Sequence, residues 1–446
     1  MIHDLVQRYS GPVPRYTSYP TAPHFSPAIA NSQYSEWLKA LPDGANLSLY
    51  VHIPFCNTMC WYCGCNTKGI RRYDPVVPYV DALLHEIETV SRLAARGKRV
   101  THIHWGGGSP NVLTPEDIRR VGTAIREAFT VAPHAEFAVE IDPRTLTGEQ
   151  VTAFWDIGVN RVSLGVQDFE EKVQAAINRL QSFDDTKRVL DLFRAHGIGS
   201  VNIDLVYGLP HQTRKSVTET ILKVLALEPD RIAIFGYAHL PSRLKNQRLI
   251  DEKALPGVIE RFGQSRRLSR ILAASGYKTV GLDHYAKPTD KLADDGIRRN
   301  FQGYTTDVSD ALIGFGASAI GQLPQGYVQN AVATGVYQTM IGETGLAAVR
   351  GVQLSLDDRV RAAAIERLMC TFDFSAKDLA ERFGASGAAA VIADAEALVD
   401  SDQDGLVKAT ADGFEMTEFG KPFVRTICAC FDVYLGQGKA QHALAV

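Results

Sequence analysis

The chain has 446 residues, of which 45% are hydrophobic and 22% charged, a balance typical of a globular protein large enough for two domains. Its formal net charge of −3 argues against nucleic acid or an acidic membrane surface as a partner, because either would require a strongly basic face. No segment reaches the roughly 18 consecutive apolar residues that span a bilayer, and the first ten residues lack the apolar core of a signal peptide. We therefore expect a cytoplasmic protein without membrane association.

Short β-rich runs alternate with longer amphipathic segments over the first 280 residues. The predicted strands are 47–53, 100–105, 137–141, 161–166, 200–207, 231–237 and 278–282. The predicted helices are 77–93, 115–129 with Thr114 as N-cap, 184–196, 216–227 and 258–274. This alternation indicates parallel β/α units with right-handed crossovers, either a complete or partial barrel or a doubly wound sheet.

Polar or glycine-rich residues follow the predicted strands in series, at 56–65, 106–110, 140–142, 165–168, 204–208 and 237–239. Any one of them could be an ordinary loop. Because the carboxyl ends of parallel strands meet at one edge of a sheet or barrel, the series predicts a single site there.

After about Gly351 the pattern changes to helices at 357–368, 376–383 and 388–399, a hairpin at 405–417 and a last helix from about Lys421. This order is typical of a small winged-helix-like domain. Residues 351–446 hold 9 Lys and Arg against 15 Asp and Glu, a net charge of −6, which would repel DNA phosphates. A cap over the site is the better interpretation.

Cys56, Cys60 and Cys63 form a C-x3-C-x2-C pattern directly after the first predicted strand. Three thiolates can bind three irons of a [4Fe–4S] cluster and leave the fourth iron open to a small molecule. With Cys65, the loop could instead hold zinc, although closed zinc sites usually join two separated cysteine pairs. Cys60 and Cys63 alone would satisfy a C-x-x-C redox motif. Spacing does not determine which three of the four cysteines would bind a cluster.

The cysteine pattern, with Tyr62 before its last cysteine, resembles the signature of the radical S-adenosylmethionine (SAM) superfamily, and Gly106–Pro110 resembles its glycine-rich motif. The match narrows to the oxygen-independent coproporphyrinogen III oxidases, to which seven segments are similar: 14–20, 52–56, 63–66, 104–108, 202–210, 300–306 and 428–432. The resemblance runs along essentially the whole chain.

This resemblance implies a partial (β/α)6-type, TIM-like barrel and a mostly helical, winged-helix-like C-terminal domain. The expected division is an N-terminal segment at 1–45, the catalytic barrel with its extension at 46–350, and the cap at 351–446. The implied reaction, a step of haem biosynthesis, turns two propionates of coproporphyrinogen III into vinyl groups and yields protoporphyrinogen IX. A 5'-deoxyadenosyl radical made from SAM would abstract a hydrogen from the propionate β-carbon.

The resemblance also assigns residues to a [4Fe–4S] cluster and two SAM molecules, without an obvious acid or base. Cys56, Cys60 and Cys63 match the cluster ligands, with Cys65 near the second cofactor. Positions matching the SAM on the cluster are Tyr50, Gly107, Glu140 and Ile320. Positions matching the second SAM are Tyr62, Gly108, Ser109, Gln167, Arg179, Asp204 and Ala238. These residues could instead have purely structural roles: helix caps for Gln167 and Asp204, a surface ion pair for Arg179 and a core position for Ile320.

A substrate with four propionates calls for cations, and Arg15, Arg298 and Arg299 are candidates, although solvated positions are as plausible for the last two. We expect the N-terminal segment to close over the substrate. The resemblance favours a monomer, and a flavodoxin or ferredoxin is a reasonable electron donor. The alternatives are a haem chaperone, or a radical enzyme that methylates or opens haem. The long N-terminal segment and Cys65 argue against the chaperone.

Overall fold

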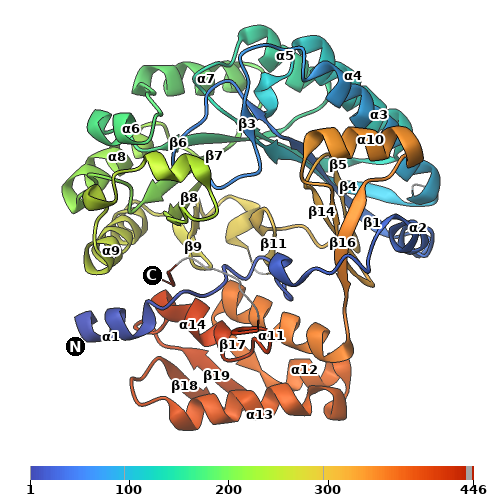
Figure 1. The fold of residues 1–446 in the computed structure, drawn as a ribbon. Helices are drawn as coiled ribbons and strands as arrows, with labels where there is room; N and C mark the ends of the chain where they lie inside the picture. The colour runs from blue at the N-terminus through green and yellow to red at the C-terminus, as the bar shows by residue number, and fades with distance from the viewer. Residues whose placement is uncertain (1, 95, 295, 438–443, 446) are drawn as a thin grey trace.

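The computed structural model describes residues 2–94, 96–294, 296–437 and 444–445. Parts of the predicted C-terminal cap, residues 438–443 and 446, lie outside the described residues. The chain forms a curved β/α barrel with a mostly helical region packed beneath it, and the N-terminal segment runs between the two (Figure 1). Within the described part of the chain, no helix is long and apolar enough to cross a membrane.

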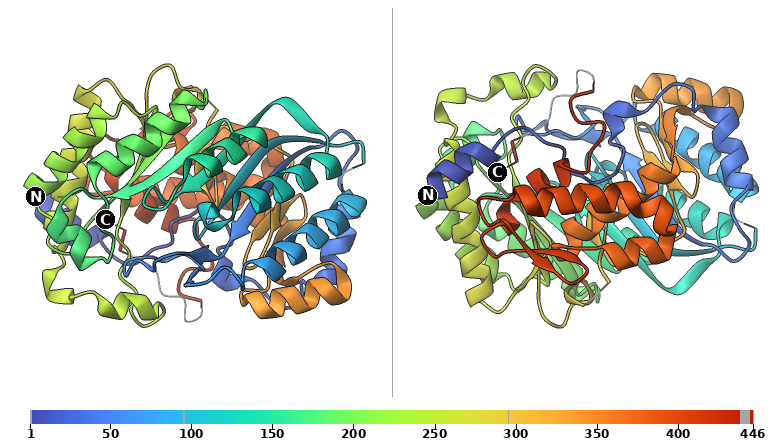
Figure 2. Two further views of the ribbon diagram at one scale, coloured as in Figure 1. Left: turned by 90° about the horizontal axis from the view of Figure 1, so that it is seen from above. Right: turned by 90° about the horizontal axis from the view of Figure 1, so that it is seen from below.

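The centre of the fold consists of six β/α units whose parallel strands lie side by side, which confirms the predicted β/α alternation. In spatial order the strands are β1 (Asn46–Ile53), β4 (Arg99–Gly107), β5 (Val131–Ile141), β6 (Arg161–Gln167), β7 (Ser200–Tyr207) and β8 (Arg231–Gly236). The helices around them are α3 (Val77–Ala94), α4 (Pro115–Ala128), α5 (Gly148–Asp156), α6 (Glu171–Ala176), α7 (Phe183–Ala195), α8 (Arg214–Ala226) and α9 (Val258–Ala274). Figure 2 shows these helices covering the outside of the curved sheet.

Further strands extend the sheet at both edges to twelve. Beside β1 lie the parallel β13 (Ala311–Phe315) and then the antiparallel β14 (Ile320–Leu323), β15 (Gly326–Asn330) and β16 (Ala348–Gln353). At the other edge, β10 (His284–Ala286) pairs with β8, and β9 (Lys278–Val280) pairs with β10, both antiparallel. A strand does form within the predicted 278–282, but its expected parallel direction was wrong, because a short turn joins β9 to β10 and a hairpin can only be antiparallel.

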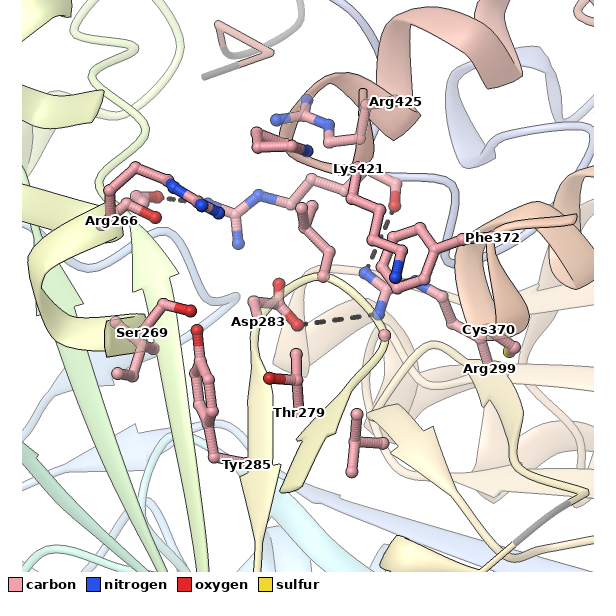
Figure 3. Close-up of a pocket in the computed structure, with 18 of the residues that line it drawn as sticks. Arg266, Ser269, Thr279, Asp283, Tyr285, Arg299, Cys370, Phe372, Lys421 and Arg425 are labelled. Carbon is pink, nitrogen blue, oxygen red and sulfur yellow. Dashed lines mark hydrogen bonds and ion pairs between the residues drawn. The ribbon is translucent and has the colours of Figure 1, made fainter. Parts of the chain in front are cut away.

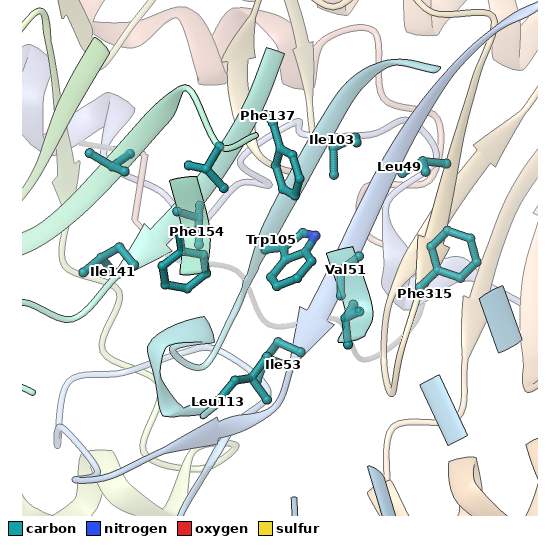
Figure 4. Close-up of a cluster of buried hydrophobic side chains, with 14 of the residues drawn as sticks. Leu49, Val51, Ile53, Ile103, Trp105, Leu113, Phe137, Ile141, Phe154 and Phe315 are labelled. Carbon is teal, nitrogen blue, oxygen red and sulfur yellow. The ribbon is translucent and has the colours of Figure 1, made fainter. Parts of the chain in front are cut away.

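The barrel core lies between the sheet and its outer helices. Trp105 is fully buried and packs against Phe137 and Phe154, with ring centroids 5.6 and 6.3 Å away. Val51 on β1 is likewise fully buried within this cluster (Figure 4). Burial on both faces explains why the parallel strands read as nearly continuous apolar runs.

The C-terminal region builds a second core. Its helices are α11 (Leu356–Thr371), α12 (Ala376–Phe383), α13 (Ala385–Ser401) and α14 (Val424–Ala429), beside an antiparallel sheet of β17 (Asp373–Ser375), β19 (Gly413–Met416) and β18 (Val407–Thr410). Leu5, Val6, Val13, Tyr16 and Tyr19 from the N-terminal segment belong to the same core. Helix α1 (Ile2–Tyr9) accordingly lies beside this region (Figure 2, right).

The remaining elements flank the barrel and its edges. Helices α2 (Asn31–Lys39) and α10 (Thr334–Thr344) pack near α3. Two small sheets consist of β2 (Phe55–Cys56) with β3 (Lys68–Gly69), and of β11 (Arg298–Asn300) with β12 (Gly303–Thr305). The first of these holds both ends of the cysteine loop together.

Candidate functional site

A cavity of about 520 Å³ lies at the carboxyl ends of the parallel strands, where the sequence pattern places the site. It brings together most of the predicted site residues, which come from the six parallel strands and the segments that follow them. Those that line it are Cys56, Cys60, Tyr62, Cys63, Gly107, Gly108, Ser109, Glu140, Gln167, Arg179, Asp204 and Ala238. Cys65 and Arg15 line the same cavity.

The three cysteines of the pattern sit in different electrostatic settings. The Sγ atom of Cys60 lies 3.5 Å from guanidinium nitrogens of both Arg144 and Arg179. The Cys56 Sγ lies 3.3 Å from the Thr67 hydroxyl, and burial raises the pKa of Cys56 to about 11. Hydrogen bonding from Cys65 lowers the pKa of Cys63 to about 7. Two guanidinium groups beside one sulfur place positive charge where metal-bound thiolates would be negative.

The cavity suits an iron–sulfur cluster better than a single metal ion. In the described parts of the chain, no three His, Cys, Asp or Glu side chains converge closely enough to hold one ion. Three soft sulfur donors nevertheless open on one hollow, and thiolates are the usual ligands of a cluster whose irons are spread apart. The buried Arg179 Nε, which has no hydrogen-bond partner among the described residues, adds positive charge beside them. The donor set therefore fits a [4Fe–4S] cluster.

The glycine segment after β4 is packed too tightly for side chains. A Cβ at Gly106 would lie 2.8 Å from the Glu140 carboxylate. Gly107 has φ of +108°, and a Cβ there would lie 2.6 Å from the His52 ring. Glycine is therefore required, and its bare backbone lines the cavity where a ligand can approach closely.

Glu140 is held at the end of β5 by a chain of rings. His104 Nε2 lies 3.1 Å from Glu140 Oε1, and the Tyr50 ring stacks on His104 at 5.9 Å. Desolvation opposes ionisation of Glu140, but hydrogen bonds from His104 and the Gly107 backbone keep its pKa below its ordinary value. A carboxylate in the cavity results, suited to an ammonium or hydroxyl group.

Arg179 is buried, which excludes the alternative of a surface ion pair. Its side chain is 7% exposed and lies 3.4 Å from Asp142, which also forms an ion pair with Arg144 at 2.6 Å. Two guanidinium groups around one carboxylate leave net positive charge facing Cys60 and the cavity.

Gln167 and Asp204 do not act as helix caps, the structural role that was the alternative for both. Gln167 adopts a left-handed φ of +71°, at an irregularity in the pairing of β6 with β7. Such strain in a residue other than glycine is common at functional sites. Asp204 accepts hydrogen bonds from Ser163 and Asn202, each at 2.7 Å, instead of capping a helix, and desolvation raises its pKa.

Tyr50 and Ile320 do not line the cavity. The Tyr50 hydroxyl lies 2.9 Å from His52 Nδ1, and the Tyr50 ring stacks on His104, the partner of Glu140. Ile320 is half-buried on β14, across β13 from Tyr50, and is thus not a fully buried core residue. The Ser109 hydroxyl is engaged as well, because it accepts from the Asp142 backbone at 3.2 Å.

Several residues of the site carried no recognisable sequence signal. The Asn246 amide donates to the Cys63 carbonyl at 2.8 Å, and Gln247 donates to the carbonyls of Tyr62 and Ala238 at 2.9 and 3.0 Å. Both lie in a short 3-10 helix, Lys245–Leu249, that clamps the cysteine loop. Asp142, which organises the two arginines, was noted only as part of a polar strand end.

The proposed substrate arginines are placed very differently. Arg298 is half-exposed, pairs with Glu366 at 3.3 Å and does not line the cavity that holds the cysteines. Arg299 is 5% exposed and lines a second cavity next to the first. Arg15 lines both.

The fold and the cysteine site define a radical SAM protein, and the model of the radical SAM superfamily matches residues 50–224. The chain is 49% identical to the oxygen-independent coproporphyrinogen III oxidase of Bradyrhizobium diazoefficiens over 438 residues, 97% of each chain. It is 42% identical to that of Paracoccus denitrificans, over 97% of this chain and 96% of the other. The structure matches that of coproporphyrinogen III oxidase from Escherichia coli with a TM-score of 0.90 and 38% identity, covering 94% and 97% of the two chains. The chain belongs to the family of oxygen-independent coproporphyrinogen III oxidases.

Proposed function

We propose that the cysteine-lined cavity carries out the reaction for which the family is named, the oxygen-independent oxidation of coproporphyrinogen III in haem biosynthesis. Two propionates become vinyl groups and protoporphyrinogen IX results. The observation that carries the proposal is the meeting of three cysteines, the glycine segment and Glu140 in one cavity, in a chain matched to these oxidases over almost its full length.

Cys56, Cys60 and Cys63 would hold the [4Fe–4S] cluster, and Arg144 and Arg179 would balance its negative charge. When bound, the cluster and SAM supply a carbon-centred radical that removes a hydrogen atom from a substrate propionate. The chain's own part is to position the reactants and to exclude water, and no side chain is required as acid or base in that first step.

Two SAM molecules are proposed in this cavity. For the one on the cluster, the Gly107 backbone and the Glu140 carboxylate lie ready for the amino group, with Tyr50 and Ile320 supporting them from behind. For the second, Arg179 offers a partner for a carboxylate, and Gln167 and Asp204 offer partners for the ribose or amino group. Tyr62, Gly108, Ser109 and Ala238 complete that half of the cavity wall.

The division into an N-terminal segment (1–45), a catalytic barrel (46–350) and a cap (351–446) is part of the same proposal. Arg15 supports a role for the segment at the substrate, because it lines the cysteine cavity and donates to the Gly236 carbonyl at 2.6 Å. We also propose a cytoplasmic monomer that receives electrons from a flavodoxin or ferredoxin.

Anaerobic incubation of the reconstituted, reduced protein with SAM and coproporphyrinogen III tests the function. Protoporphyrinogen IX with two vinyl groups is the expected product, identified by mass spectrometry after oxidation to the porphyrin. Tight haem binding without turnover would instead identify a chaperone, and a methylated or opened ring would identify a haem-modifying enzyme. Either result would overturn the proposal.

A further inference from the structure

A second cavity adjoins the cysteine site, and the proposed radical chemistry does not use it. Its volume is about 640 Å³, within the range of roughly 300–1,000 Å³ usual for small-molecule sites. Its walls come from the β8–β10 edge of the barrel, the N-terminal segment and the C-terminal region (Figure 3). Both cavities are lined by Arg15, Gly236 and Tyr237, so these residues form their common boundary.

This second cavity is strongly cationic. Among the residues that the structure describes, three acidic ones line it, Asp283, Asp294 and Glu418, against six basic ones: Arg15, Arg261, Arg266, Arg299, Lys421 and Arg425. The excess is opposite in sign to the net charge of the chain, −3, and to the −6 of residues 351–446. Positive charge gathered in a hollow of an otherwise acidic protein indicates an anionic ligand.

Two of these cations, Arg299 and Arg261, have buried guanidinium nitrogens without an acceptor among the described residues. Arg299 Nε has no hydrogen-bond acceptor within the described chain, and its Nη1 lies 4.0 Å from Asp283, too far for a hydrogen bond. Arg261 Nε is likewise without an acceptor there. Burial, reinforced by Arg15 and Arg299, lowers the pKa of Arg425 to about 10. Buried donors without acceptors cost free energy, which an entering carboxylate would recover.

Two further cations face the space from opposite walls, and one of them, Lys421, also forms an ion pair with Glu418. Figure 3 shows Arg266 reaching in from α9 and Lys421 from the C-terminal region, with Asp283 between them. Considering described residues only, the Arg266 guanidinium makes no hydrogen bond or ion pair. An apolar wall completes the cavity, formed by Tyr207, Phe262, Leu282, Tyr285 and Phe372. Cations beside an apolar wall suit a ring that carries several carboxylates.

We propose that this cavity binds the propionates of the tetrapyrrole that are not reacting, with Arg266, Arg299 and Lys421 as their anchors. The inference rests on the proposed function and deepens it. Planar guanidinium groups can take carboxylates through two parallel hydrogen bonds. A ring anchored here directs another propionate past Arg15 into the cysteine cavity, across the shared boundary. Because each turnover removes a carboxylate, the product is held more weakly than the substrate.

The test uses reconstituted holoenzyme and two stable probes, coproporphyrin III with four carboxylates and its uncharged tetramethyl ester. Binding is followed by fluorescence quenching. We expect the R266Q/K421Q double variant to weaken coproporphyrin binding by about 100-fold, about tenfold for each charged hydrogen bond lost, with little change for the ester. Unchanged coproporphyrin affinity, or an equal loss for the ester, would overturn the proposal.

Arg267 provides the matched control. It neighbours Arg266 on α9 but is exposed, donates to the Thr218 hydroxyl at 3.2 Å and lies outside the cavity, so R267Q should bind coproporphyrin as the parent does. Melting temperature and iron content check that each variant is folded. Binding is read without turnover, so a protein that binds coproporphyrin through these cations but converts no coproporphyrinogen would refute the proposed function and leave the carboxylate site standing.

Discussion

Cys63 and Cys65 lie two residues apart, and their surroundings distinguish them as metal ligands. The Cys65 backbone N–H donates to Cys63 Sγ at 3.4 Å. The hydrogen bond between the two thiols lowers the pKa of Cys63 to about 7 and raises the pKa of Cys65 well above its ordinary value. Of these two neighbours, Cys63 thus gives up its proton more readily, which favours it over Cys65 as the ligand.

We therefore expect Cys63→Ser to lose the cluster and Cys65→Ser to keep it. The measurement is the iron and sulfide content of anaerobically reconstituted protein, with the absorbance of the cluster as a second readout. A Cys65→Ser protein that lacks iron while Cys63→Ser retains it would reverse the assignment.

The buried Arg179 guanidinium holds two groups of the site in position. It spans Asp142 and Cys60, at 3.4 and 3.5 Å, within one rigid fork, whereas a lysine offers only a point charge. We expect Arg179→Lys to raise the KM for SAM about tenfold, in line with the loss of one charged hydrogen bond. Steady-state kinetics at saturating porphyrinogen checks this, with Arg188→Lys on the outer helix α7 as control. A KM equal to that of the parent would contradict the expectation.

The site was largely predictable wherever a residue type is dictated by the local chain. The cysteine spacing was visible in the sequence, and so were the glycines at positions that leave no room for a Cβ atom. Asn246 and Gln247 were not, because they act on the cysteine loop from about 185 residues away in the chain. A polar side chain that satisfies distant carbonyls leaves no periodic pattern.

Among the elements, those with a strong local pattern were predicted well. Helix α4 begins after Thr114, whose hydroxyl accepts from the Asp117 N–H as an N-cap, and β7 has the predicted bounds. The direction of β9 was missed because a strand of three residues carries no signal for its partner. Helices α5 and α6 were not predicted, because segments of nine and six residues are too short to show a clear helical period of hydrophobic residues.

Glu86 joins four elements through one buried carboxyl group. It lies on α3 and accepts hydrogen bonds, each of 2.7 Å, from the Gly316 N–H after β13, from Asn330 on β15 and from Tyr337 on α10. Desolvation outweighs these bonds and raises the pKa of Glu86 to about 7 from an ordinary 4.5.

A raised carboxyl pKa makes the fold more stable in mild acid. Between the two values the folded state keeps a proton that the unfolded chain releases, so the stabilisation is complete below about pH 4.5 and is lost as the pH rises through about 7. The loss is on the order of 3 kcal/mol at most. We expect the melting temperature of the parent to fall from pH 5 to pH 8 more steeply than that of Glu86→Gln. Parallel pH profiles would show that Glu86 does not titrate in this range.

At the scale of the whole molecule, the two ends of the chain are tied together. Arg425 on α14 donates to the Pro14 carbonyl at 2.9 Å and to the Leu444 carbonyl at 2.8 Å. Pro12 and Leu444 also form an antiparallel bridge. The sequence indicated an N-terminal segment near the substrate, but contacts between residues 411 apart cannot be inferred from local pattern. The segment thus belongs to the C-terminal core as well as to the cavity wall.

Removal of residues 1–25 should therefore do more than open the cavity. It would delete five side chains of the C-terminal core, each at most 7% exposed: Leu5, Val6, Val13, Tyr16 and Tyr19. At about 1.5–3 kcal/mol each, their loss is on the order of 10 kcal/mol, similar to the stability of a whole domain. We expect limited proteolysis to cut the truncated chain within 356–429, with the barrel strands still protected.

Arg15→Gln separates the two roles of the segment. This change removes the cation shared by both cavities but leaves the five core side chains in place, so turnover should fall while residues 356–429 stay resistant to protease. If the truncated chain were as resistant as Arg15→Gln, the segment would act only at the substrate and its burial would contribute little. If both variants were cut, Arg15 itself would help to hold the chain ends together, beyond its bond to the Gly236 carbonyl. Mass spectrometry of the fragments decides between these outcomes, because the barrel and the C-terminal region release distinct peptides.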